Sequence, residues 1–347
     1  MVPNPFVISF GRKPTQYIER SIIVDEITDE LRSDTVQNQC FMLAGVRGSG
    51  KTVTMSAIEQ KLRDDKDWIV VDLNVERDML TSLVAKLYDS KKISNFFDTQ
   101  INLSAFGIGV SVKNVSPVAD IESAVEKILK ELKKRKKRLL VTVDEVYNTQ
   151  YIKEFAGSFQ IMIRQELPMY LIMAGLYENI HNLEDEKNLT FLYRAPKYYM
   201  DPLSYAAIKK SYMEILGIPE NEALAMAKLT KGYPFAYQAL GKYVWESKDH
   251  RLTDDVIYKY DEALRAYVYD KIWSELSEKD RWNVSFITTD DSMKVADFLD
   301  RSGQTKSEFS QYRERLRNKG IIDTTVRGYI SIRLPRFTEY VKNKTEL

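Results

Sequence analysis

The chain has 347 residues, with 51 Lys and Arg against 50 Asp and Glu and a single cysteine. At about 150 residues per domain this length predicts two or three domains. Its 44% hydrophobic and 29% charged residues are typical of a globular protein. One cysteine excludes an intramolecular disulfide and a cysteine-based zinc site, and two isolated histidines give no metal or catalytic pattern. The sequence shows neither a secretion signal nor an apolar run of the ~18 residues that a membrane span needs, so we expect a cytoplasmic protein with no membrane partner.

The first half of the chain alternates apolar, strand-like runs with helical patterns. Strands are predicted at 40–45, 68–73, 139–143, 169–175 and 198–200. The alternation at 101–112 predicts a β-hairpin, and Pro117 begins a predicted helix that ends in the basic run 133–138. We interpret this basic run as a solvated helix C-terminus, with a nucleic-acid patch as the alternative. Strands that alternate with helices indicate a parallel sheet covered by helices.

The second half changes character after Asp201. Residues 204–276 predict several helices, with Thr253 as the cap of a long one. From residue 278 the order becomes three helices, the third over 306–319, followed by two short β-like runs. This is the element order of a winged helix.

A phosphate-binding motif lies between the first predicted strand and the helix that follows it. Residues 45–52 read GVRGSGKT and match the pattern G-x-x-x-x-G-K-[ST]. Glycines let successive N–H groups point at phosphate oxygens, and the helix N-terminus adds its positive dipole end. Lys51 can reach the β- and γ-phosphates, and the Thr52 hydroxyl can ligate Mg²⁺. The predicted phosphate-binding residues are Gly45, Val46, Arg47, Gly48, Ser49, Gly50, Lys51, Thr52 and Val53.

Two carboxylates follow the third predicted strand. Asp144 and Glu145 come directly after the apolar run LLVTV, 93 residues beyond Lys51. The carboxyl end of a parallel strand is where α/β sheets bind ligands. We therefore interpret Asp144 as a Mg²⁺ partner and Glu145 as the group that orients or deprotonates an attacking water. An acid in that position favours hydrolysis over transfer of the phosphoryl group to a small molecule.

Together these residues resemble the AAA+ and STAND branch of P-loop ATPases, in particular bacterial and archaeal relatives of origin-recognition ATPases. The resemblance extends to Phe10-Gly11 and 18–20 near the N-terminus. It implies an α/β P-loop NTPase core, a parallel sheet covered by helices, over 1–202. An α-helical lid over 203–276 and a winged-helix domain over 277–347 would follow. ATP or ADP and Mg²⁺ are the implied ligands.

The same resemblance implies further site residues. Arg194 stands where the family has an arginine finger, with a surface arginine as the alternative. Pro234, in the run TKGYP, resembles a lid proline that packs against the nucleotide, with a helix-starting turn as the alternative. Gly175-Leu176 stands where many AAA+ proteins have a polar sensor residue. The residues implied near the adenine are Tyr17, Ile18, Arg20 and Ile23.

The predicted helix over 306–319 has the composition of a DNA recognition helix. Phe309, Tyr312 and Leu316 fall at helical spacing and should face the core, which leaves a basic stripe outward. Residues 301–347 contain eleven Lys and Arg against five Asp and Glu. The alternative is a winged helix that acts as an intramolecular brace. The candidate DNA contacts are Lys306, Arg313, Arg317 and, at the predicted wing tip, Arg327.

The sequence therefore predicts an ATP-binding and ATP-hydrolysing switch that couples its nucleotide state to a partner, with double-stranded DNA preferred. A protein partner and self-association stay open. The alternative is a nucleotide-binding signalling or scaffold protein with little turnover. A small-molecule kinase would need an acceptor site, and the sequence does not reveal one.

Overall fold

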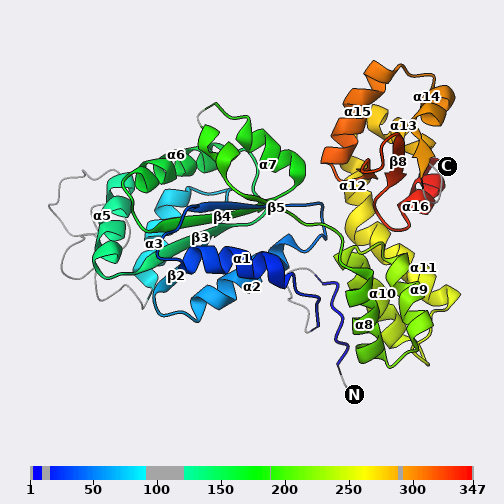
Figure 1. Cartoon of the computed structure of the whole chain (residues 1–347), viewed down its shortest axis with the longest axis horizontal. Helices are drawn as coiled ribbons and strands as arrows, with labels where there is room; N and C mark the ends of the chain where they lie inside the picture. The colour runs from blue at the N-terminus through cyan, green and yellow to red at the C-terminus, as the bar shows by residue number, and fades with distance from the viewer. Residues whose placement is uncertain (1–2, 10–15, 91–120, 188, 288–291, 346–347) are drawn as a thin grey trace. The chain divides into compact units, whose positions relative to one another are not determined.

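A computed structural model describes residues 3–9, 16–90, 121–187, 189–287 and 292–345 (Figure 1). The predicted hairpin at 101–112 and the predicted helix start at Pro117 lie outside these described residues. The chain divides into two compact units. Unit 1 comprises Met1–Glu19, Gly45–Gly50 and Met200–Leu347, and unit 2 comprises Arg20–Ala44 and Lys51–Tyr199.

Unit 2 is built around a five-stranded parallel sheet with the order β2-β3-β4-β1-β5. Every side chain of β1 and β4 is buried, as expected for strands with helices on both faces. Ala44 pairs with Gly175 and Val143 with Met173, so β1, β4 and β3 end at the same edge of the sheet. Each predicted strand is present within one residue at either end. The strands are β1 (Cys40–Ala44), β2 (Trp68–Leu73), β3 (Arg138–Val143), β4 (Met169–Gly175) and β5 (Lys197–Tyr199).

Helices cover both faces of this sheet (Figure 1). The helices α1 and α2 pack side by side on one face. On the other face α3, α5, α6 and α7 pack in one apolar core with Leu139, Val141 and Val143 of β3. The helical elements of unit 2 are α1 (Ser21–Arg32), α2 (Lys51–Arg63), α3 (Met79–Asp89), α5 (Ile121–Lys134), α6 (Gln150–Arg164), α7 (Tyr177–Glu184) and the 3-10 helix η2 (Thr190–Arg194).

The basic run 133–138 is divided between three structural positions. Lys133 and Lys134 end α5, where they complement the helix dipole. Lys137 forms an ion pair with Asp67 at 2.9 Å. Arg138 begins β3 and donates to backbone carbonyls at the end of α1. The run therefore connects a solvated helix end to a buried strand.

Unit 1 contains a bundle of helices after residue 204. The N-terminal segment packs onto them through Phe6, which is 2% exposed and contacts the rings of Tyr212 and Tyr237. A Cβ at Gly241 would lie 2.5 Å from the Phe6 ring, so glycine is needed for this close approach. Thr253 caps α11, as predicted, by accepting from the Val256 N–H. The elements are α8 (Tyr205–Leu216), α9 (Glu220–Leu229), α10 (Pro234–Glu246), α11 (Asp254–Leu264), the π-helical turn η3 (Arg265–Tyr269) and α12 (Asp270–Glu275).

The C-terminal part of unit 1 combines helices with a three-stranded antiparallel sheet of order β6-β8-β7. The order of three helices and two later strands matches the sequence prediction, whereas β6 and α16 were not predicted. No helix of the described residues has both the length and the apolarity to cross a bilayer. The elements are α13 (Glu278–Phe286), β6 (Met293–Lys294), α14 (Val295–Ser302), α15 (Lys306–Asn318), β7 (Ile322–Asp323), β8 (Tyr329–Ile332) and α16 (Phe337–Thr345).

Candidate nucleotide-binding site

The predicted phosphate loop connects the end of β1 to the first residue of α2. Gly48 and Gly50 have φ values of +69° and +91°, which lie in the left-handed region that favours glycine. A Cβ at Gly45 would lie 2.4 Å from Ser49 Oγ. Lys51, the first residue of α2, is only 8% exposed. The loop thus has the backbone conformation and the buried lysine that a phosphate cradle requires.

The magnesium-type oxygen ligands meet at the end of β3. The Thr52 hydroxyl, on α2, donates to Asp144 Oδ2 at 2.6 Å, and the Glu145 N–H donates to Asp144 Oδ1 at 2.8 Å. Asp144 is half-buried and Thr52 is exposed, so this oxygen pair is accessible to solvent. A hydroxyl and a carboxylate are hard oxygen donors of the kind that Mg²⁺ binds together with substrate phosphates. The residues present therefore fit the ion, and Thr52 and Asp144 would hold it.

Glu145 occupies an unusual backbone position. Its φ is +52°, in the left-handed region, and its side chain is exposed. Non-glycine residues adopt this conformation uncommonly, and such residues cluster at functional sites. The N–H of the next residue, Val146, donates to the carbonyl oxygen of Ala174 in β4 at 2.8 Å. The turn therefore presents the Glu145 carboxylate to solvent directly beyond Asp144.

Gly175, at the end of β4, has no room for a side chain. A Cβ at Gly175 would lie 2.9 Å from the Val146 carbonyl oxygen and 3.0 Å from Val146 Cγ1. The first of these contacts is with backbone, which cannot move aside as a flexible side chain could. The turn after Asp144 and Glu145 therefore occupies the space that a side chain at position 175 would need.

A second polar contact between α2 and the sheet was not predicted from the sequence. This contact joins Glu59 of α2 to Asp72 of β2. Glu59 lies seven residues after Thr52, so both side chains project from the same face of α2. Thr142, two residues before Asp144, donates to Asp72 Oδ1. Burial, followed by the adjacent Asp72, raises the pKa of Glu59 to about 7. Burial alone would raise the pKa of Asp72, but hydrogen bonds from Thr142 and Glu59 outweigh it and lower that pKa.

Arg63 balances part of this second cluster. Its guanidinium lies 3.0 Å from Asp72 Oδ2 and 3.4 Å from Glu59 Oε2. The Lys86 ammonium binds the backbone carbonyl of Asp72. Glu59 and Arg63 are four residues apart on α2, whereas only the fold identifies Asp72 and Lys86 as their neighbours.

Arg194 ends the 3-10 helix η2, and its side chain is exposed. Among the described residues it makes no hydrogen bond or ion pair. The adjacent Tyr193 is 74% exposed. The structure thus places the predicted arginine finger on an open surface of unit 2.

The residues predicted near the adenine are distributed over both units. Tyr17 and Ile18 belong to the N-terminal segment of unit 1, whereas Arg20 and Ile23 belong to unit 2. Arg20 is the N-cap residue of α1, and Ile23 is half-buried on that helix. An adenine pocket formed by these four residues stays a prediction.

The segment around Pro234 contacts the phosphate loop within unit 1. Pro234 begins α10, as the helix-start alternative also expected. A Cβ at Gly50 would lie 3.8 Å from Pro234 Cγ, which is ordinary van der Waals distance. The preceding residue, Tyr233, donates its hydroxyl hydrogen to the Arg47 carbonyl. Tyr233 was not singled out from the sequence, although it lies inside the run TKGYP.

The predicted recognition helix α15 presents a mixed surface. Phe309 and Leu316 are buried, as predicted. Tyr312, which was also predicted to face the core, is only half-buried, and the Arg315 guanidinium lies 4.9 Å from the centroid of its ring. The four candidate DNA contacts lie on α15 and in the β7–β8 turn: Lys306, Arg317 and Arg327 are exposed and Arg313 is half-buried.

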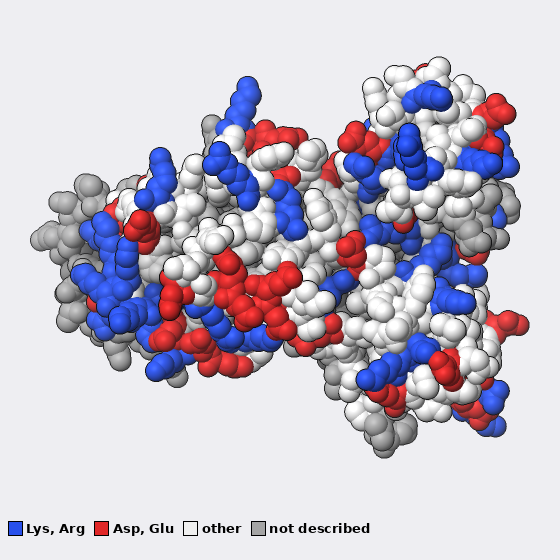
Figure 2. Space-filling model, in the orientation of Figure 1, with Lys and Arg blue, Asp and Glu red and all other residues white. Residues whose placement is uncertain are grey.

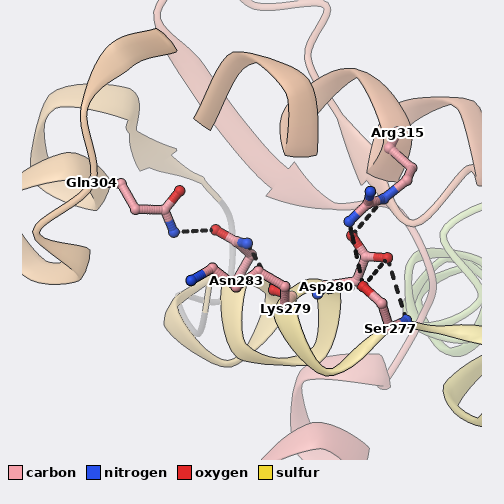
Figure 3. Close-up of polar contacts among 6 residues, drawn as sticks. All are labelled: Ser277, Lys279, Asp280, Asn283, Gln304 and Arg315. Carbon is pink, nitrogen blue, oxygen red and sulfur yellow. Dashed lines mark hydrogen bonds and ion pairs between the residues drawn. The ribbon is translucent and has the colours of Figure 1, made fainter. Parts of the chain in front are cut away.

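Arg315 is exposed on α15, but its guanidinium is bound to a buried carboxylate. Its guanidinium donates to Asp280 Oδ1 at 2.8 and 2.5 Å, and Asp280 is 1% exposed (Figure 3). Ser277 and Asp280 form a capping box at the start of α13. In the same view, Gln304 donates to Asn283 Oδ1 at 2.6 Å. These contacts fix α15 and the α14–α15 turn against α13.

The five-stranded parallel sheet flanked by helices matches the core of P-loop NTPases. Residues 19–191 match a family described as an ATPase domain predominantly from Archaea. Residues 266–341 match a domain of unknown function (DUF8462). A comparison with curated protein sequences found no match.

Solved structures support the same class. The Walker-type ATPase PABY2304 of Pyrococcus abyssi superposes with a TM-score of 0.65 at 16% identity, over 96% of this chain and 99% of that chain. The ORC2 protein of Aeropyrum pernix, solved in ADPNP–ADP complexes, gives 0.60 at 12% identity, over 98% and 97%. At these identities the likeness concerns the fold. The predicted resemblance to AAA+-type P-loop ATPases similar to origin-recognition proteins is thus confirmed at the level of the fold.

Proposed function

We propose that this protein binds and hydrolyses ATP and that its nucleotide state controls the binding of double-stranded DNA. The observation that carries the proposal is the 2.6 Å contact between the Thr52 hydroxyl and Asp144, which adjoins the buried Lys51. Two adjacent residues, Lys51 and Thr52, and Asp144, which lies 92 residues beyond Thr52, thereby provide a cation and an oxygen pair for a phosphate–metal complex. When bound, Mg²⁺ supplies positive charge that neutralises the phosphate oxygens.

Each predicted site residue has a role in this proposal. N–H groups of the 45–50 loop bind phosphate oxygens, and the Lys51 ammonium contacts the β- and γ-phosphates. The exposed Glu145 carboxylate accepts a proton from the attacking water as a general base. The open position of Arg194 suits stabilisation of charge on the γ-phosphate of its own or a second copy's ATP. Pro234 and the adenine residues named above would contact the nucleoside.

Multiple-turnover ATP hydrolysis tests this function. A general base typically contributes about 10²–10⁴-fold in rate, so Glu145→Gln should lower kcat by that range while ATP still binds. Glu154→Gln, an exposed carboxylate on the following helix α6, is the matched control and should hydrolyse like the wild type. Equal rates for the wild type and Glu145→Gln would refute hydrolysis at this site.

We further propose that residues 277–347 form a winged-helix module, with α15 as the recognition helix and the β7–β8 turn as the wing. The element order and the β6-β8-β7 sheet support this. On the face that Figure 2 shows, this part of unit 1 carries basic side chains with acidic ones among them. Phosphate contacts make DNA binding depend steeply on salt. Gel-shift titration at several salt concentrations, with ATP or ADP, tests the module, and absence of any duplex shift at low salt argues against it.

The glycine at the end of β4 favours a second candidate, a nucleotide-binding signalling or scaffold protein with little turnover. Val146 excludes a polar side chain from position 175, so a charge-sensing group is lacking there. This candidate predicts tight nucleotide binding with a hydrolysis rate near that of Glu145→Gln. The turnover experiment above therefore separates the two candidates.

A further inference from the structure

Two residues of the α10 N-terminus bind the outer side of the phosphate loop within unit 1. The Tyr233 hydroxyl donates to the Arg47 carbonyl oxygen. The Phe235 N–H, in the first turn of α10, donates to the Gly48 carbonyl oxygen at 3.1 Å. Two consecutive carbonyls of the loop are therefore held by neighbouring positions of one segment.

The contact is close enough to determine which residue can occupy the loop. A Cβ at Gly48 would lie 2.5 Å from Tyr233 Oη and 2.9 Å from Phe235 Cβ. Glycine is therefore needed at position 48 for two reasons: the positive φ of the backbone and the close contact with Tyr233. Tyr233 is 6% exposed. Burial raises its pKa far above the usual value, so the hydroxyl stays protonated and remains a donor.

Peptide planarity links these outer carbonyls to the inner N–H groups. The Arg47 carbonyl and the Gly48 N–H belong to one trans peptide unit and point in opposite directions. A donor that fixes the carbonyl on the outside therefore also fixes the direction of the Gly48 N–H. In a phosphate loop the N–H groups are what the phosphate oxygens bind, and they are most effective when oriented in advance.

The same segment also reaches the C-terminal sheet. The Lys231 ammonium, two residues before Tyr233, donates to the Ile332 carbonyl of β8 at 3.1 Å. Gly232, between them, has a φ of +74°, and its carbonyl accepts from the Leu203 N–H at 2.8 Å. The segment that holds the phosphate loop is thus itself anchored at several points.

We propose that Tyr233 is a positioning residue for nucleotide binding, whose hydroxyl orients the phosphate loop for the β- and γ-phosphates. The inference rests on the proposed ATP-binding function and assigns it a residue that contacts neither the nucleotide nor the metal.

The test is Tyr233→Phe, which removes one oxygen and keeps the ring. We expect the Kd for ATP and the KM to rise about 5–10-fold, or about 1–1.4 kcal/mol, with kcat within about twofold. The matched control is Tyr212→Phe, which removes another buried hydroxyl that donates to a backbone carbonyl, that of Tyr237 at 2.7 Å. This control should bind ATP like the wild type.

A second measurement does not depend on nucleotide. Hydrogen exchange of the loop amides at 46–50 in nucleotide-free protein should be faster in Tyr233→Phe and unchanged in Tyr212→Phe. Wild-type exchange rates in Tyr233→Phe, or equal ATP affinity of both variants and wild type, would overturn the inference. Failure of the wild type itself to bind ATP would instead overturn the proposed function, so the two failures are distinguishable.

Discussion

Two carboxylates of this protein, Asp144 and Asp280, each bind a side chain of a neighbouring helix, but the first is accessible to solvent and the second is buried. Asp144 is half-buried and accepts from the exposed Thr52 hydroxyl and from its neighbour's N–H. Asp280 is 1% exposed and is bound by Arg315 and by the Ser277 hydroxyl. A neutral, accessible donor leaves Asp144 able to exchange partners for a ligand. A guanidinium and a cap satisfy Asp280 internally, so its role is to hold helices together.

The largest expected effect is on ATP binding at the candidate nucleotide site. Lys51→Ala should abolish measurable ATP binding in calorimetry, because each hydrogen bond to a charged group contributes about 1.5–3 kcal/mol and Lys51 serves two phosphates. Lys61→Ala, on the same helix and paired with Asp25 at the surface, should bind ATP normally. Unchanged affinity in Lys51→Ala would show that the site has been assigned wrongly.

Loss of the buried Asp280 carboxylate should lower the free energy of unfolding and leave nucleotide binding unchanged. Asp280→Ala leaves the Arg315 guanidinium without its buried partner and should cost about 2–3 kcal/mol, less than a fully buried pair because Arg315 can rehydrate. Denaturant unfolding followed by fluorescence of Trp282, on the same helix, measures this. Glu314→Ala, at an exposed position of α15, should stay within about 0.5 kcal/mol. A large loss of ATP affinity in Asp280→Ala would contradict the distinction between the two sites.

The Glu59–Asp72 cluster should give a pH dependence of intermediate size. The pKa of Glu59 is raised in the folded chain from 4.5 to about 7, so the folded state binds the extra proton. Its contribution to stability is present below pH 4.5 and is lost as the pH rises through 7. Because Glu59 is partly exposed, we expect a decrease of about 1–2 kcal/mol across this window relative to Glu59→Gln. Parallel stability curves for the wild type and Glu59→Gln would exclude this titration.

The smallest stability effects are expected on the basic face of the C-terminal module. Arg317→Ala and Arg327→Ala change exposed side chains and should alter folding by less than about 0.5 kcal/mol. If they contact phosphates, each should lower the salt dependence of DNA binding by about one unit of slope. Arg315→Ala provides the contrast, because it should destabilise the module through Asp280. DNA binding that is unaffected by both surface changes would remove α15 and the wing from the interface.

Much of the fold was predictable because its signals are local. Apolar runs identified all five strands of the parallel sheet, and glycine spacing identified the phosphate loop. The two-residue strand β6 was not predicted, because so short a segment has no periodicity and forms only by pairing with Tyr329 and Ile330 of β8. The helix α16 was missed because its apolar residues are few and its neighbours decide which of them are buried.

The sequence by itself predicted the residues of the candidate nucleotide site: the glycines, the lysine and the hydroxyl stand in the run 45–52, and the two carboxylates directly follow an apolar strand. Only the tertiary structure decided which side chains that are distant in the sequence come into contact. Tyr233 reaches the Arg47 carbonyl across 186 residues, and Arg315 reaches Asp280 across 35. Sequence patterns record which face of a helix or strand is apolar, whereas a hydrogen bond depends on two backbones meeting within about 3 Å. That meeting is a property of the packed chain.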